Sequence, residues 1–230
     1  MDRIVFAFVA LGLAAAVGLR FATLGVGEAL AVDLGLLANV LTAYVAVPAG
    51  LALVFATRIL PRALGADGLA FPRLQRAALV LYGAAAALFV AGAVGLMGGG
   101  EDQAQPEWVL LMAYQPAVVD DAVAWLLGGL VVLGIGLSFN AFNVVVSVHR
   151  LRPDGVGFDH LPASVMGGYA QAFGHGLAAP ALVLVGATGL AERFVGLGLF
   201  AAPLGGDPLL FRHLFWLAAH PLLLTSLLPV

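Results

Sequence analysis

Six long apolar runs, almost free of charged side chains, constrain this chain more than any other feature of its sequence. Each is about 20 residues or longer, the length that an α-helix needs to cross the hydrocarbon core of a bilayer. The runs cover residues 4–24, 32–57, 77–98, 119–148, 164–190 and 209–229. Charged residues make up 10% of the chain, against about 25% in a soluble domain. The pattern predicts an all-α integral membrane protein with six transmembrane helices.

The polar segments between these runs are too short to separate domains, so we expect a single membrane domain over residues 1–230. The longest of them, residues 98–106, has the composition of a loop. The first run could be read as a signal peptide with Arg3 as a weak positive region. Its length, through Leu24, favours a retained first helix instead. Glycines such as Gly134 permit close helix packing.

Arginine is distributed unequally between the two sides that alternating helices would define. If the N-terminus is cytoplasmic, seven arginines fall on that side and three on the other. The cytoplasmic set is Arg3, Arg58, Arg62, Arg73, Arg76, Arg150 and Arg152, and the opposite set is Arg20, Arg193 and Arg212. The positive-inside rule then places both termini in the cytoplasm. We expect the chain in a bacterial or archaeal cytoplasmic membrane.

Composition also limits the chemistry that the chain can carry. It has no cysteine, which excludes disulfides, thiolate metal sites and cysteine-ligated iron-sulfur clusters, so a metal would need His, carboxylate or neutral oxygen ligands. Only five histidines are present, and the first is His149. There is no basic run of the kind that binds nucleic acid, and we expect no nucleic-acid partner.

Polar side chains inside the apolar runs are costly in a membrane and draw attention to function. Gln171 and His175 are four residues apart and share one helical face. They form either an intramembrane polar pair or contacts to a partner helix, and a structural role is favoured over ligand binding. The fourth run carries Asn140 and Asn143.

Two segments carry a family resemblance. Residues 205–229 read GGDPLLFRHLFWLAAHPLLLTSLLP, which resembles the sixth helix of heme-copper oxidase subunit I, the catalytic subunit of cytochrome c and quinol oxidases. Residues 60–74 read LPRALGADGLAFPRL, similar to that family's loop after helix two. The resemblance covers most of the chain from about residue 57 and implies the same six spans. The residues that carry its structural motif are Ala70, Phe71, Pro72, Arg73, Asp207, Pro208, Trp216 and Pro221.

The resemblance also implies which redox residues to look for. In the family one copper ligand is a His at the position of His220, followed by a proton-carrying Glu and a redox-active Tyr. Those two positions are Leu222 and Leu224 here, and leucine can supply neither function. The family's low-spin heme takes one His from helix two, and the corresponding position here is near Ala38. The chain ends at Val230, so the resemblance extends to helices one to six only, and we expect a truncated, degenerate member.

These features favour a non-catalytic, subunit-I-like structural subunit of a larger membrane electron-transfer complex of respiratory type. On its own the chain is not expected to be an enzyme. We expect no cofactor, with heme or copper bound only if a partner chain supplies the other ligands. His220 is then a vestigial metal ligand. The expected partners are other membrane subunits and lipid.

Two alternatives remain open from the sequence. The chain could be one half of a split heme-copper oxidase or nitric oxide reductase, with His220 as a metal ligand in trans. The weaker alternative is a small transport or channel component with a polar path through Gln171, His175, Asn140 and Asn143.

Overall fold

The computed structural model describes residues 47–98 and 121–228. The first apolar run, the start of the second, Ala38 and residues 99–120 lie outside the described residues. The helices are α3 (Val47–Val54), the π-helix η3 (Phe55–Ile59), α4 (Leu60–Ala63), α5 (Pro72–Gly98), α7 (Asp121–Leu151), α8 (Ala163–Val195) and α9 (Leu210–Ser226), with 3-10 turns at Phe158–His160 and Ala202–Leu204. All regular structure in these two ranges is helical.

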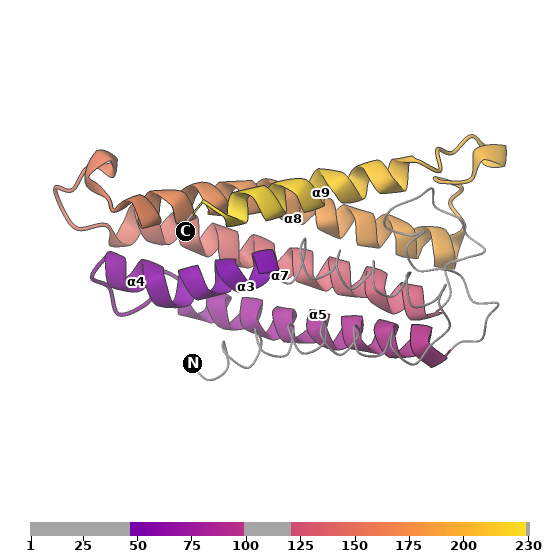
Figure 1. Ribbon diagram of the computed structural model, residues 1–230, viewed down its shortest axis with the longest axis horizontal. Helices are drawn as coiled ribbons and strands as arrows, with labels where there is room; N and C mark the ends of the chain where they lie inside the picture. The colour runs from indigo at the N-terminus through magenta and orange to yellow at the C-terminus, as the bar shows by residue number, and fades with distance from the viewer. Residues whose placement is uncertain (1–46, 99–120, 229–230) are drawn as a thin grey trace.

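The four longest helices run side by side in an elongated bundle (Figure 1). α7 contacts α5 and α8, and α8 contacts α9. The short α3 contacts α7, α8 and α9. Within the described residues three helices, α5, α7 and α8, are long and apolar enough to cross a membrane. The part of the chain that the structure describes is therefore all-α, with the helix lengths and hydropathy of an integral membrane protein.

Several helices extend beyond the apolar runs that predicted them. α5 begins at Pro72 rather than at residue 77, and α8 continues past residue 190 to Val195. The segment α3, η3 and α4 continues past residue 57 to Ala63. Arginines end the apolar runs in sequence but do not end a helix, because a cation near a helix C-terminus is favourable and Pro is favoured at a helix start. Gly65, in the left-handed region at φ 67°, follows α4 and ends this helical segment.

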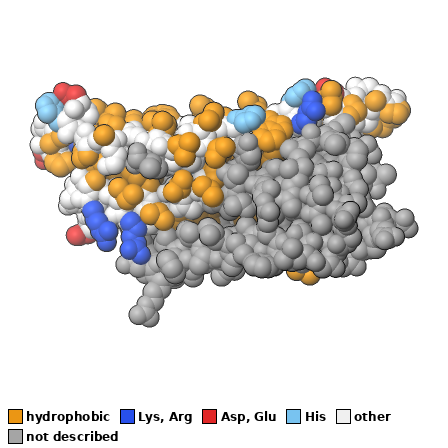
Figure 2. Space-filling view, viewed as in Figure 1, with side chains coloured by type: hydrophobic (Ala, Val, Ile, Leu, Met, Phe, Trp, Pro, Cys, Tyr) orange, Lys and Arg blue, Asp and Glu red, His pale blue; other side chains and the backbone are white. Residues whose placement is uncertain are grey.

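Two apolar clusters form the core. The larger joins α7 to its neighbours, and its most buried side chains include Leu127, Leu130, Leu182, Phe211 and Phe215. The smaller lies around Phe55, Leu60, Val144, Val148 and Val165. Figure 2 shows hydrophobic side chains over the middle of the visible face and charged side chains towards its two ends. That distribution matches a bundle whose middle contacts lipid acyl chains.

The end of the bundle that holds the start of α7 is closed by two polar contacts. Arg193 of α8 donates to the Asp121 carboxylate at 2.5 Å, which joins the end of α8 to the start of α7. The backbone N–H of Leu199 donates to Glu192 at 3.0 Å, and Glu192 is 5% exposed. These contacts orient the loop that leads into α9.

Candidate functional site

One face of α7 holds the start of α5 through side-chain hydrogen bonds. The backbone N–H of Phe71 donates to Asn143 Oδ1 at 3.0 Å, and Asn143 Nδ2 donates to the Phe71 carbonyl at 3.0 Å. The N–H of Ala70 donates to Ser147 Oγ at 2.9 Å. Both Asn143 and Ser147 have no exposed surface. The chain entering α5 is thus fixed by side chains about 70 residues later in the sequence.

Gln75 extends these bonds from α5 through α7 to α3. Its Nε2 donates to Asn140 Oδ1 at 3.1 Å, and its Oε1 accepts from Asn143 Nδ2 at 3.3 Å. Asn140 Nδ2 in turn lies 3.5 Å from the carbonyl of Ala52. We call Gln75, Asn140, Asn143 and Ser147 the amide network. The amide nitrogen and the carbonyl oxygen of Asn143 both have partners, which is the condition for burying such a group without a large cost.

The Ala70 to Arg73 motif therefore has two parts. Its backbone is bound by the amide network, and its side chains face outward. The Phe71 ring stacks on Phe142 of α7, with centroids 6.0 Å apart, and the Arg150 guanidinium lies 5.9 Å from the Phe71 centroid. Arg73 is exposed. Phe71 thus marks the junction between a buried polar network and an open surface.

His175 joins α8 to α9. Its Nε2 lies 3.1 Å from Ser226 Oγ and 3.3 Å from the carbonyl of Leu222, and His175 is 1% exposed. Ser226 Oγ donates its own hydrogen to that carbonyl at 2.5 Å. Both partners therefore accept from the imidazole, so Nε2 carries a hydrogen. Of the two roles that the sequence predicts for this residue, the structure shows contact with a partner helix.

Replacing His175 tests this link. We expect His175→Leu to lower the free energy of unfolding by about 1–2 kcal/mol, because a buried hydrogen bond between two helices is lost. The matched control is His213→Leu at the start of α9, where the side chain is exposed and little should change. Thermal unfolding in detergent, followed by tryptophan fluorescence, gives the comparison. Equal midpoints for the two variants would contradict the assignment.

Gln171 does not share the contacts of His175. It is 2% exposed, and its Nε2 has no hydrogen-bond partner among the described residues. Asn140 and Asn143 instead bond to residues of α3 and α5. Three of the four residues of the predicted polar path, Asn140, Asn143 and His175, thus bond to α3, α5 and α9.

His220 lies on the outside of α9. It is exposed, and its ring stacks on Trp216 one turn earlier, with centroids 4.6 Å apart and an interplanar angle of 28°. Trp216 also contacts Phe215 edge to face at 5.3 Å. Leu222 is fully buried and Leu224 is 63% exposed. The two leucines that replace the family's Glu and Tyr therefore face different surroundings.

Asp207 and Pro208 form the turn that leads into α9. Asp207 Oδ1 accepts from the Leu209 N–H at 2.9 Å, and its carbonyl accepts from the Leu210 N–H at 3.1 Å. This is the local turn that an Asp side chain favours. A side chain on Gly206 would overlap the carbonyl of Leu199, so only Gly fits there. Pro221 lies inside α9 without ending it.

The five histidines do not gather into one group in the part of the chain that the structure describes. All five lie in the described ranges, since residues 1–46, 99–120 and 229–230 contain none. His149 bonds the Tyr169 hydroxyl at 2.7 Å, His160 contacts Asp159 at 3.1 Å, and His175 bonds α9. Over residues 47–98 and 121–228 no three His, Cys, Asp or Glu side chains form a group able to hold a metal ion. A stable site needs several ligands in fixed geometry, which these side chains do not supply.

Prediction from the sequence did not single out Gln75, Ser147 and Ser226, which form several of these hydrogen bonds. The signal for Ser147 was present, because residues 140, 143 and 147 share one helical face. Gln75 lies one turn after Phe71, outside the predicted apolar runs. The sequence therefore did not indicate which way its side chain points. Ser226 lies in an apolar run, and its partner His175 is on another helix. No local pattern therefore links the two residues.

Comparison with known proteins gives a consistent result. The family model for cytochrome c and quinol oxidase polypeptide I matches residues 3–230. The alternative cytochrome c oxidase subunit 1 of Bradyrhizobium diazoefficiens is 29% identical over 184 residues, covering 73% of this chain and 30% of that protein. The probable cytochrome c oxidase subunit 1-beta of Nocardia farcinica is 30% identical over 167 residues, covering 73% of this chain and 28% of that protein. The cytochrome c oxidase polypeptide 1 of Halobacterium salinarum is 27% identical over 179 residues, covering 76% of this chain and 29% of that protein.

The chain spans 28–30% of the length of these three relatives. Its match to the family model, by contrast, runs through almost all of its own residues. The two motifs that carried the resemblance, around Phe71 and around Asp207, lie inside that match. The chain belongs to the cytochrome c and quinol oxidase polypeptide I family.

Proposed function

We propose that this chain is a non-catalytic structural subunit of a larger membrane electron-transfer complex, in which the subunit I fold serves as a packing scaffold. The observation that carries the proposal is the surroundings of His220. The one histidine at a family metal position is exposed and stacked on Trp216, and leucines occupy the Glu and Tyr positions after it. Buried polar side chains elsewhere, such as Asn143 and His175, bond neighbouring helices.

The proposal includes six transmembrane helices in one domain over residues 1–230, with both termini cytoplasmic. Support comes from the end of the bundle that holds α4, the start of α5 and the end of α7. Arg62, Arg73, Arg76 and Arg150 lie there. Arginine gathered at one end of a bundle is typical of the cytoplasmic side.

Isolation of the native assembly tests the structural role. We expect an affinity-tagged chain, extracted in mild detergent, to carry other membrane subunits with it at fixed stoichiometry. Mass spectrometry identifies them. A chain recovered alone, under conditions that keep other respiratory complexes intact, would count heavily against the proposal.

A second experiment addresses His220. We expect His220→Ala to leave the heme and copper content of the isolated assembly, per copy of this chain, unchanged, because the described residues form no group of metal-ligating side chains around it. His213→Ala is the matched control on the same helix. Reduced-minus-oxidised spectra and elemental analysis give the readout.

One observation favours a second candidate function. His220 is exposed on α9, so ligands from another chain could reach it, as in a split oxidase or nitric oxide reductase. Loss of metal in His220→Ala, with normal metal in His213→Ala, would support that function and overturn the non-catalytic one.

A further inference from the structure

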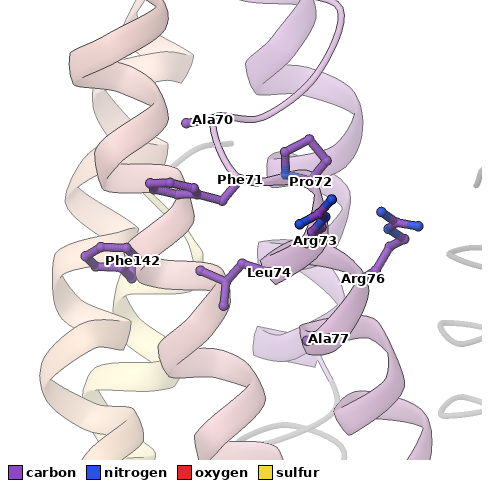
Figure 3. A pocket seen from close by; sticks show the side chains of 8 residues that line it. All are labelled: Ala70, Phe71, Pro72, Arg73, Leu74, Arg76, Ala77 and Phe142. Carbon is purple, nitrogen blue, oxygen red and sulfur yellow. The ribbon is translucent and has the colours of Figure 1, made fainter.

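A pocket of about 680 Å³ opens at the start of α5. One part of its wall is apolar and includes Phe71, Leu74 and Phe142. The other part carries Arg73 and Arg76 (Figure 3). No acidic side chain is among the described residues that line it. The pocket thus combines a positive part with a hydrophobic part.

The two arginines are placed to act together. They are three residues apart on α5, so they share a helical face. Both are exposed, and among the described residues neither guanidinium has a carboxylate partner. An Arg side chain presents several N–H donors in a fork that matches phosphate oxygens. Two such forks one turn apart favour an anionic phosphate group.

The apolar part continues away from the arginines along the bundle. In Figure 3 the Phe142 ring lies further along α5 than the Phe71 ring, level with Leu74. Phe142 is 56% exposed, and Val80, one turn beyond Arg76, is 69% exposed. Large apolar side chains exposed in this direction are suited to an acyl chain rather than to water.

The length of α5 sets the depth of the pocket in the membrane. α5 has 27 residues and is about 40 Å long at roughly 1.5 Å per residue. The hydrocarbon core is about 30 Å thick, so an end turn of α5 lies at the level of the lipid headgroups. Arg73 and Arg76 occupy that end of the helix.

We infer that this pocket binds one anionic phospholipid, with its headgroup phosphate on Arg73 and Arg76 and an acyl chain along Leu74 and Phe142. Arg150 adds a third positive charge at the Phe71 ring. Basic pockets on the cytoplasmic side of helix bundles are suited to such lipids. The inference goes beyond the structural role proposed above and does not depend on whether the assembly is catalytic.

Native mass spectrometry of the full chain, with the subunits that co-purify, tests the inference. The protein in neutral detergent is titrated with phosphatidylglycerol or with phosphatidylcholine of the same acyl chains. We expect phosphatidylglycerol to bind more tightly, and Arg73→Gln/Arg76→Gln to weaken it by about tenfold or more, since each basic residue near a membrane surface contributes on the order of 1 kcal/mol. Phe142→Ala is expected to weaken long-chain lipid more than a short-chain analogue.

Arg58→Gln/Arg62→Gln is the charge-matched control, because it removes two arginines from the same end of the bundle outside the pocket. Unfolding midpoints establish that both pairs of variants are folded. Equal losses in the two pairs would show diffuse charge attraction and overturn the site. Equal binding of the two lipids would also overturn it, as would displacement of the lipid by millimolar inorganic phosphate, which would indicate a free-phosphate site.

Discussion

Asn143→Leu is expected to lower the free energy of unfolding by about 3 kcal/mol or more. The substitution keeps a side chain of similar size but leaves the Phe71 N–H and Gln75 Oε1 without their partner, and it removes one of the two donors to the Phe71 carbonyl. Each buried polar group left unpaired costs about 1–3 kcal/mol. Thermal unfolding in detergent measures the loss. Hydrogen exchange in the peptide containing Phe71 shows whether the start of α5 is released.

Ser138→Ala is the control on the same helix. Ser138 Oγ donates to the Gly134 carbonyl within α7 at 2.8 Å, a bond that joins no second element. We expect a change within about 0.5 kcal/mol. Asn143→Asp keeps the shape and the acceptor but loses both donors, and the burial of its charge adds to the expected loss of stability. Normal stability in Asn143→Asp would refute a structural role for the amide network.

Replacing the glycines at the contact between α7 and α8 with alanine is expected to cause the second large loss of stability. A Cβ on Gly134 would lie 2.7 Å from the Ala179 carbonyl oxygen, and one on Gly186 would lie 2.5 Å from that of Leu127. Backbone atoms cannot move aside as a flexible side chain can, so the helices must separate. We expect Gly134→Ala and Gly186→Ala each to cost about 1–3 kcal/mol. Unfolding midpoints are the measurement.

Gly176→Ala provides the matched control on α8. A Cβ there meets nothing within 4 Å, so the substitution adds no clash. Because alanine is the better helix former, stability should stay the same or rise by up to about 1 kcal/mol. If Gly134→Ala were as stable as Gly176→Ala, α7 and α8 could not pack as closely as described.

Much of the fold was predictable because it depends on local composition. Long apolar runs identified α5, α7 and α8 as membrane-capable helices, and the motif around Asp207 identified the family. Helix ends were less predictable. Arg73 and Arg76 lie before the apolar run that begins at residue 77, although α5 already begins at Pro72, since charge near a helix end is compatible with helical structure.

The candidate site was less predictable because its hydrogen bonds join residues far apart. Asn140 and Asn143 stand out in the sequence as costly polar groups in an apolar run. Their partners, Gln75 and the Phe71 backbone, are 65 to 72 residues earlier. The pair Gln171 and His175 shares a helical face, but local spacing could not show that His175 bonds α9.

The sequence by itself indicated that this chain is a membrane protein and identified its family. It also showed that leucines replace the motif Glu and Tyr. Hydropathy and motif spacing are properties of neighbouring residues, so they can be read along the chain. Only the tertiary structure decided which histidine is buried. His175 and His220 both lie in apolar runs, yet one is enclosed by α9 and the other stacks on Trp216 at the surface. Burial depends on which helix face meets a neighbour, and that is set by packing between helices.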